Sequence, residues 1–434
     1  MIIMSLQSKH FIQALKNGVV PATGCTEPIA VAFGAATCMA QLTNREIQAI
    51  EVHVSPNVMK NALAVMVPGT GEPGLLVAAA AGAIAGDATV GLSVIEGLRA
   101  TDLPTILDLA HSGKVTAKTA LVPDDLYVEV TIKDLENTVT VAIAGSHTNI
   151  FSLKKDNQIL IDHPRPAAHA SSESKQFLQT MNFKAVWDFA MNEPLEHLRF
   201  MKEAHTLNLA LAQDGFTHDY GLQLGQSING AKRNHFGSGT ENDLGNRMIA
   251  YAAAASDARM GGAQLPAMSN SGSGNQGITA TIPVSVAADA VQATEEQLIR
   301  AQTLSHLTAL YIHSFLPVLS AFCATDSAAM GAAAGVVYLY DGTYEDACHA
   351  IQNMAGDAAG MICDGAGCAC AMKVATAVSS MYRGVNLALQ GIVIPNSNGI
   401  VCPTIDETIH GIGRLGTEGL RETDPVILDI MLNK

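Results

Sequence analysis

The segments Leu126-Tyr-Val-Glu-Val-Thr-Ile132 and Thr138-Val-Thr-Val-Ala-Ile143 determine the fold class of the first half of the chain. Both alternate between apolar and polar residues, which is typical of a half-buried strand, and the short polar turn between them predicts a hairpin. Asn149-Ile-Phe-Ser-Leu153 continues the alternation, and Ile50-Glu-Val-His-Val-Ser55 shows it earlier in the chain. The sequence therefore predicts an antiparallel sheet in this part of the molecule.

Helical patterns lie on both sides of the first predicted strand. We expect helices over residues 5–17, 29–39, 75–86, 92–98 and 104–111, and Gly/Pro-rich turns over 56–61 and 68–74. Cys25 or Thr26 suits the N-cap of the second helix, with Pro28 in its first turn. A thiol at a helix N-terminus lies near the positive end of the helix dipole, which predicts a lowered pKa and a reactive Cys25. On spacing alone, a structural role for this cysteine stays open.

Beyond the linker His163–Ser174, the sequence has almost no strand pattern. Helices are expected over residues 183–189, 193–212, 243–257, 294–314, 328–340, 344–354, 370–390 and 406–420. The predicted fold class is thus an α+β N-terminal domain with an antiparallel sheet, followed by a mostly all-α C-terminal domain. The expected division is N-terminal helices over 1–44, packed at the active site, an α+β domain over 45–165 and a helical domain over 175–434.

The composition restricts the class of partner. The 434 residues carry a net charge of −15 with 15% charged and 48% hydrophobic residues, so phosphate backbones and anionic membranes would be repelled. A small molecule is the expected partner. We find no secretory signal over residues 1–13 and expect a cytoplasmic protein. The apolar run 315–340 contains Asp326 and much Ala and Gly, which favours buried helices over a membrane span, and the many Ala/Gly helix faces suggest a homodimer.

Three of the eight cysteines lie close together in Met361-Ile-Cys-Asp-Gly-Ala-Gly-Cys-Ala-Cys-Ala-Met-Lys373. Gly365 and Gly367 favour a turn here, and a turn can bring two thiolates to one metal cluster. In a continuous helix Cys363 and Cys370 would stand about 10 Å apart, at about 1.5 Å of rise per residue. Further thiolates would have to come from elsewhere in the sequence, and Cys25 and Cys323 are the best placed.

The longest helix-free stretch of the second half is Met260–Gly277, which is rich in Gly, Ser and Asn. Such a run predicts a nest of backbone amides suited to a carboxylate or phosphate. A flexible linker is the alternative, although apolar helices flank the stretch on both sides.

Several of these motifs together resemble a known family. They are Gly24-Cys-Thr-Glu-Pro28, Ser55-Pro-Asn-Val-Met-Lys-Asn61 with Pro68-Gly-Thr70, His147-Thr-Asn149, Ser269-Asn-Ser-Gly-Ser-Gly-Asn-Gln-Gly277, and Cys363-Asp-Gly-Ala366 with Cys370 and Lys373. On these motifs, which span most of the chain, it resembles the L-cysteine desulfidases, the iron–sulfur L-serine dehydratases and their uncharacterised bacterial relatives.

The resemblance implies a 4Fe–4S cluster held by Cys323, Cys363 and Cys370, with one iron open or loosely bound to Cys25. The implied reaction is β-elimination of L-cysteine to pyruvate, ammonia and sulfide, with the open iron as Lewis acid. The alternative is that the substrate is L-serine, which would be dehydrated by the same mechanism.

The site residues are expectations that follow from the resemblance and the motifs. Cys25 is the candidate general base or displaceable fourth ligand, and Lys373 could donate to substrate or to cluster sulfur, or pair with an acidic neighbour. The expected substrate-binding residues are Thr26, Glu27, Asn61, His147, Asn270, Ser271, Gly272, Ser273, Asn275 and Gln276, with Ser271–Gln276 holding the carboxylate.

One feature departs from the family pattern. Related proteins often carry a lysine where this chain has Gly367, and the following Cys368 makes the choice between Cys368 and Cys370 as ligand ambiguous. Two other classes also stay open: a pyridoxal-phosphate β-eliminating lyase, for which Lys60 and Lys232 lack a convincing setting, and a non-enzymatic cluster sensor.

Overall fold

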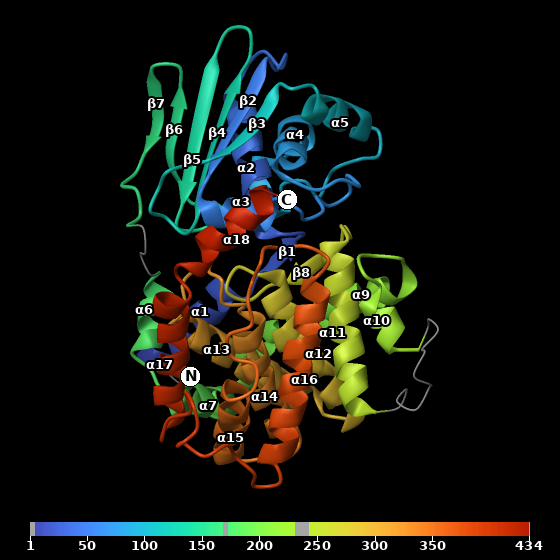
Figure 1. Ribbon diagram of the computed structural model, residues 1–434, viewed down its shortest axis with the longest axis vertical. Coiled ribbons are helices and arrows are strands. Elements are labelled where there is room, and N and C mark those ends of the chain that lie inside the picture. Colours follow the sequence, from blue (N-terminus) through green and yellow to red (C-terminus); the bar gives the residue numbers. More distant parts are fainter. Residues whose placement is uncertain (1–4, 168–171, 231–242, 434) are drawn as a thin grey trace.

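The computed structural model of the chain describes residues 5–167, 172–230 and 243–433. A six-stranded sheet forms one end of the molecule, and helices make up most of the rest (Figure 1). The strand order is β3-β2-β4-β5-β6-β7, and every neighbouring pair is antiparallel except β2 with β3. The strands are β2 (Ala49–Val54), β3 (Val115–Thr119), β4 (Tyr127–Lys133), β5 (Thr138–Ala144), β6 (Ile150–Lys155) and β7 (Gln158–Asp162).

One face of the sheet is covered by α2 (Thr26–Gln41), which is itself covered by α4 (Leu75–Ala85) (Figure 1). Glycines at both contacts allow this close layering. A Cβ on Gly34 would lie 2.9 Å from Val130 of the sheet, and one on Gly82 would lie 2.1 Å from the Ala32 carbonyl oxygen. The remaining elements here are α3 (Pro56–Ala62), η1 (Ala88–Ser93) and α5 (Leu103–His111).

The helical part packs around the buried helices α12, α13 and α14. Its elements are α1 (Leu6–Gly18), α6 (Glu173–Gln179), α7 (Phe183–Asn192), α8 (Leu195–Leu198), η2 (Arg199–Met201), α9 (Lys202–Thr217), α10 (Leu224–Ile228), α11 (Leu244–Met260), α12 (Gly274–Ala290), α13 (Glu295–His313), α14 (Thr325–Leu339), α15 (Tyr344–Ala355), α16 (Cys370–Ala388), α17 (Ile405–Arg414), η3 (Leu415–Gly419) and α18 (Thr423–Leu432). A short antiparallel pair, β1 (Pro21–Thr23) with β8 (Pro266–Met268), lies between this part and the sheet (Figure 1).

Two large hydrophobic cores correspond to these two parts. The core under the sheet draws on residues 29–153, and the helical core draws on residues 178–412 together with α1. The two ends of the described chain do not pack in the part to which they are adjacent in sequence. Phe11 and Leu15 of α1 pack in the helical core, and Leu428 of α18 packs in the core under the sheet. Helices α1 and α18 therefore each connect the sheet part to the helical part.

The predicted fold class, α+β followed by largely helical, is confirmed. Three local expectations are wrong. Residues 56–62 form helix α3 rather than a turn, because Pro56 occupies its first position after Ser55. Residues 92–98 do not form an α-helix, since the chain kinks at Gly91 with φ of 59°. The helix-free stretch ends at Ser273 and not at Gly277, because α12 begins at Gly274.

Strands β1, β3, β7 and β8 and helices α6, α10 and α18 were not predicted from the sequence. Helix α12 is the apolar helix expected after the stretch 260–277, but no bounds were predicted for it, because it is buried on all sides and lacks the amphipathic period by which helices are recognised. Residues 168–171 of the expected linker lie outside the described residues, as does Lys232. No helix in the described part of the chain is long and apolar enough to cross a membrane.

Candidate active site

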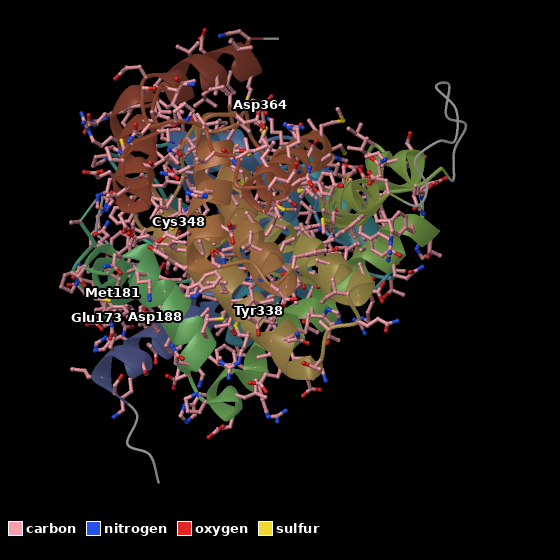
Figure 2. All side chains as sticks on the ribbon, turned by 90° about the horizontal axis from the view of Figure 1, so that it is seen from below. Glu173, Met181, Asp188, Tyr338, Cys348 and Asp364 are labelled. Atoms are coloured by element: carbon pink, nitrogen blue, oxygen red, sulfur yellow. The ribbon has the colours of Figure 1, made fainter. Side chains whose placement is uncertain are left out.

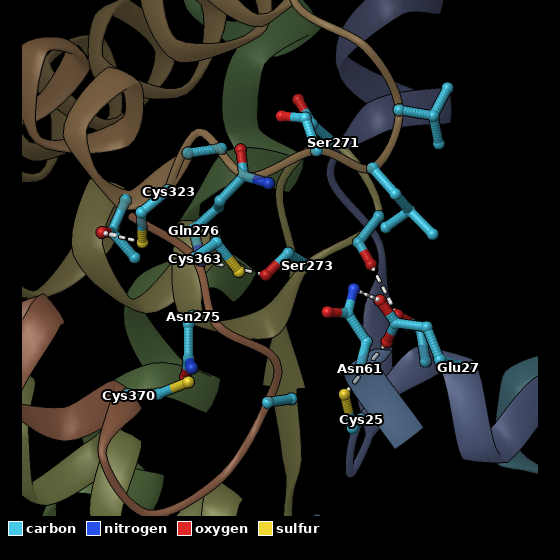
Figure 3. Close-up of a pocket in the computed structure, with 18 of the residues that line it drawn as sticks. Cys25, Glu27, Asn61, Ser271, Ser273, Asn275, Gln276, Cys323, Cys363 and Cys370 are labelled. Atoms are coloured by element: carbon cyan, nitrogen blue, oxygen red, sulfur yellow. Dashed lines mark hydrogen bonds between the residues drawn. The ribbon is translucent and has the colours of Figure 1, made fainter. Parts of the chain in front are cut away.

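A pocket lies where several segments meet: the start of α2, helix α3, the turn between β5 and β6, the end of α11, the start of α12, the loop between α13 and α14, and the loop before α16 (Figure 3). The predicted site residues that line it are Cys25, Thr26, Glu27, Asn61, His147, Ser271, Gly272, Ser273, Asn275, Gln276, Cys323, Cys363, Cys370 and Lys373. Only Asn270 of the predicted set does not line the pocket. It is fully buried behind the pocket wall, where its Nδ2 donates to the His306 carbonyl at 3.1 Å.

Backbone pairing brings Cys323 next to Cys363. An isolated antiparallel bridge joins Phe322 to Ile362, with the Cys323 amide donating to the Met361 carbonyl at 2.9 Å and the Cys363 amide to the Ala321 carbonyl at 2.7 Å. The loop then turns, with Gly365 at φ of 100°, before Cys370 starts α16. Residues 362–369 are thus a loop, as the glycines predict.

The three cysteines form one side of the pocket in Figure 3, and Cys25, Glu27 and Asn61 form the other. Cys25 packs in a small cluster with Ala366 and Cys370. Burial and, after it, the neighbouring Cys363 raise the pKa of Cys323 strongly and that of Cys370 to about 11. The thiols of Cys323 and Cys370 are therefore neutral without a metal, and a bound metal would be needed to ionise them.

Cys25 occupies the N-cap of α2, as its position predicts, but its pKa moves in the direction opposite to that expected. Burial is the largest cause of the raised pKa, and the Glu27 carboxylate is the next. The thiol donates to Glu27 Oε2 at 3.0 Å. The desolvation of the thiolate and its repulsion by Glu27 outweigh the helix dipole, so Cys25 is held as a thiol.

Glu27 is a buried carboxylate at the centre of a hydrogen-bond group. Besides Cys25, it accepts from Thr26 Oγ1 at 3.1 Å and from Asn61 Nδ2 at 2.8 Å. Burial alone would raise its pKa, but the field of His147 and these donors lower the pKa below the ordinary value. Glu27 is therefore ionised at neutral pH.

The Ser/Gly/Asn stretch forms a tight turn followed by a helix start. Ser271 and Gly272 have φ of 51° and 81°, and Asn270 and Ser273 exchange backbone hydrogen bonds across the turn. Ser273 then caps α12, and its Oγ accepts from the Gln276 amide at 3.5 Å. The first amides of α12 have no partner within the helix and lie at the pocket wall. Thr26 Oγ1 fastens the turn to α2 through the Gly272 carbonyl at 2.9 Å.

Three buried polar atoms of the pocket have no hydrogen-bond partner among the described residues: Asn61 Oδ1, His147 Nε2 and Gln276 Oε1. Buried polar atoms are rarely left without a partner, so these three suit a polar ligand. The pKa of His147 is lowered by burial, although Glu27 opposes this, so the ring is neutral at neutral pH. A neutral imidazole with an unpartnered nitrogen can accept a proton.

Arg259 is a pocket residue that the sequence reading missed. It is 3% exposed, and its Nε donates to the Gly24 carbonyl at 3.1 Å. A Cβ on Gly274 would lie 2.2 Å from this Nε, so the guanidinium lies against the first residue of α12. No carboxylate of the described residues forms an ion pair with it. A buried cation beside a helix N-terminus suits an anion. Its position on the mostly buried α11 gave no signal of this role.

Lys373 forms an ion pair with Asp364. Of the two roles expected for this lysine, the structure thus shows the pairing with an acidic neighbour. Cys368 does not line the pocket, whereas Cys370 does, so the loop presents Cys370 as the ligand candidate. Cys348 is on α15 and far from Asp364 in Figure 2. It is buried against Tyr344, whose hydroxyl lies within hydrogen-bond reach, as a structural cysteine would be.

The donors in the pocket fit an iron–sulfur cluster better than a single ion. In the ranges that the structure describes, no three His, Cys, Asp or Glu side chains come close enough together to hold one metal ion. A cluster distributes its thiolates over several irons, so the thiols need to face one space rather than converge on one point. Cys323, Cys363 and Cys370, all free of disulfides, line one pocket in this way.

The chain is similar to proteins of several bacteria along nearly its whole length. It is 44% identical over 424 residues to a UPF0597 protein of Actinobacillus pleuropneumoniae serotype 3, covering 98% of this chain and 96% of the relative. The UPF0597 protein of Chromobacterium violaceum is 45% identical over 425 residues, with 98% and 97% covered. That of Vibrio parahaemolyticus is 42% identical over 429 residues, with 99% and 100% covered.

A family model described as "Serine dehydratase alpha chain" matches residues 114–429, which include Arg259, the start of α12 and all three pocket cysteines beyond Cys25. The family resemblance inferred from the motifs is thereby confirmed, and membership indicates an enzyme of the lyase type. The chain belongs to the serine dehydratase alpha chain family.

Proposed function

We propose that the protein eliminates the β-substituent of a small L-amino acid, with L-cysteine as its substrate and pyruvate, ammonia and sulfide as products. The elimination removes the α-proton and HS⁻, and water then hydrolyses the resulting 2-aminoacrylate to pyruvate and ammonia. The observation that carries the proposal is the pocket itself, in which three thiols face an imidazole, a carboxylate and a buried cation.

Cys323, Cys363 and Cys370 would hold a 4Fe–4S cluster, which when bound supplies a Lewis acid for the leaving group. Cys25 belongs to the small cluster against which Cys370 packs, and it is the fourth cysteine among the described residues that line the pocket. Burial raises its pKa and so keeps it protonated, which leaves no thiolate to take the α-proton, and we assign it as a displaceable fourth ligand rather than as the base.

The two charged ends of the substrate match different walls of the pocket. Arg259 and the first amides of α12 would bind the α-carboxylate, because both present positive charge. The unpartnered oxygens of Asn61 and Gln276 would accept from the α-ammonium group. This arrangement fixes the Cα–H bond relative to the side chains that react.

His147 is the group best suited to take the α-proton. Its ring is neutral, and Nε2 lacks a partner among the described residues. The ionised Glu27 lies close enough to act on the titration of His147, and it would stabilise the imidazolium after the proton transfer. Lys373, held by Asp364 at the opposite wall, would add positive charge beside Cys363 and Cys370.

L-Serine is the second candidate substrate, favoured by the family description. A pyridoxal-phosphate lyase fits poorly for two reasons. Among the described sheet strands only β2 and β3 are parallel, and the one lysine among the described pocket residues is paired with Asp364. We further propose that the protein acts in the cytoplasm, as a homodimer.

The test is anaerobic purification and reconstitution, followed by a visible spectrum, iron and sulfide analysis, and pyruvate assays with L-cysteine and L-serine in parallel. A brown protein that forms pyruvate from cysteine supports the desulfidase, and pyruvate from serine alone moves the assignment to the dehydratase. A brown protein inactive on both points to the sensor. A colourless, inactive protein after reconstitution contradicts the proposal.

A matched pair of cysteine variants sharpens this test. Cys323 and Cys348 are 7% and 6% exposed, but only Cys323 lines the pocket. Cys323→Ala is expected to lose the brown colour and the activity, whereas Cys348→Ala keeps both. Equal iron content in the two variants would remove Cys323 from the ligand set.

A further inference from the structure

Lys60 is a buried lysine with no place in the proposed reaction. It is 1% exposed and does not line the pocket. Lysine is almost never fully buried unless its charge is paired. Its ammonium donates to Asp424 Oδ1 at 2.5 Å, to the Cys363 carbonyl at 3.2 Å and to the Ser320 carbonyl at 3.4 Å. Because an ammonium has three donors, all of them are used.

Asp424 completes the contact from the other side. It lies in the first turn of α18, and its Oδ2 accepts from the Ala321 amide at 3.0 Å. Ala321 in turn accepts the amide of Cys363, and Cys323 follows two residues later. The Lys60–Asp424 pair therefore holds the segment before Cys323 and the backbone of Cys363 at the same time.

The backbone of Lys60 makes a second, independent contact with the same loop. A Cβ on Gly365 would lie 2.5 Å from the Lys60 carbonyl oxygen and 3.4 Å from Met431 of α18. Helix α3, helix α18 and the loop between Cys363 and Cys370 thus pack against one another with no room for a side chain at residue 365.

We infer that Lys60 and Asp424 are positioning residues that set the separation of Cys323 and Cys363, and so determine how firmly an iron–sulfur cluster is retained. The inference rests on the proposed function, in that these cysteines hold the cluster. Its geometric basis is that one buried ion pair contacts the backbone of both cysteine segments and fastens them to α3 and α18.

The experiment compares the wild-type protein with Lys60→Met, Asp424→Asn and the double variant Lys60→Met/Asp424→Leu. After anaerobic reconstitution, iron per chain is measured, and the cluster absorbance is followed during exposure to a chelator. In the apo proteins, the rate at which thiols react with a disulfide reagent is measured as well. We expect lower iron content, chelator loss faster by about tenfold and faster thiol reaction in all three variants.

The double variant separates positioning from simple stability. It removes both charges, which relieves the unpaired buried charge of each single variant, but it restores no hydrogen bond to Cys363 or Ala321. Recovered thermal stability with continued rapid cluster loss supports positioning. Recovery of both would show that the pair serves stability alone and would overturn the inference.

Arg300→Met is the matched control. Arg300 also donates to two carbonyls, those of Ala190 and Glu193, and pairs with Glu296, but it lies away from the cysteines. It should lower stability and leave the chelator rate unchanged. Wild-type iron content and chelator rate in the Lys60 and Asp424 variants would refute the inference, whereas a wild-type protein that takes up no cluster would refute the proposed function instead. If Lys60→Met fails to fold, Asp424→Asn decides.

Discussion

Replacing Arg259 with methionine removes the buried guanidinium and keeps most of its volume. A guanidinium has five N–H donors. Nε donates to the Gly24 carbonyl and Nη1 to Met260 Sδ, so three N–H groups remain for a ligand. Two charge-assisted bonds to a carboxylate, at about 1.5 kcal/mol each, amount to about 3 kcal/mol. At about 1.4 kcal/mol per decade, KM for L-cysteine should rise about 150-fold.

The assay is pyruvate formation over a range of L-cysteine concentrations, with cysteamine as a competing ligand that lacks the carboxylate. Arg259→Met should raise KM far more than it lowers kcat, and it should leave the inhibition constant of cysteamine unchanged. Loss of the bond to Gly24 should also cost about 1 kcal/mol of stability. Arg247→Met is the control, because Arg247 is on the same helix and pairs with Asp289 at 2.9 Å outside the pocket. A KM for Arg259→Met within about threefold of wild type would refute the assignment of the carboxylate site.

Three further predictions follow from the pocket and its surroundings. His147→Asn should lower kcat by about 10²–10⁴-fold. Because the pKa of His147 is lowered, kcat/KM of the wild-type enzyme should decrease only below pH 6.5, and the variant should not show this decrease. Burial lowers the pKa of His306 to about 3, so between pH 6.5 and 3 the unfolded chain binds the proton and stability falls as pH falls. In urea unfolding, the free energy of unfolding of His306→Gln should decrease between pH 7 and pH 5 by about 2 kcal/mol less than that of the wild type. The same pH dependence in both proteins would contradict this. Gly365→Ala, with φ of 100° and a Cβ 2.5 Å from the Lys60 carbonyl, should lower thermal stability and iron content, whereas Gly367→Ala, which meets nothing within 4 Å, should change neither.

The sequence predicted those features that depend on local pattern. The strand alternation in residues 126–143 gives the hairpin of β4 and β5, and the glycines between Cys363 and Cys370 give a loop that ends where α16 begins. Cys25 is at the predicted helix start. In each case the deciding residues are neighbours in sequence, so the pattern contains the information.

Features that depend on contacts between distant segments could not be read in this way. The bridge between Phe322 and Ile362 places two cysteines together across 40 residues of sequence, and no periodicity records it. The raised pKa of Cys25 depends on burial and on Glu27 together, whereas the sequence shows only the helix start. Arg259 and Lys60 look like ordinary surface cations until the fold buries both.

Helix α18 has a consequence for the order in which the molecule can be completed. Domains generally fold from the N-terminus during synthesis, but Lys60 meets Asp424 only after more than 360 further residues have been made. Until then Lys60 of α3 lacks the carboxylate with which it pairs, and the Ala321 amide lacks the acceptor that Asp424 provides. The segment before Cys323 therefore gains its contact with α18 only after Asp424 has been made. Cys370 is the last of the three pocket cysteines in the sequence, so a cluster held by all three could be assembled only after most of these residues have been synthesised.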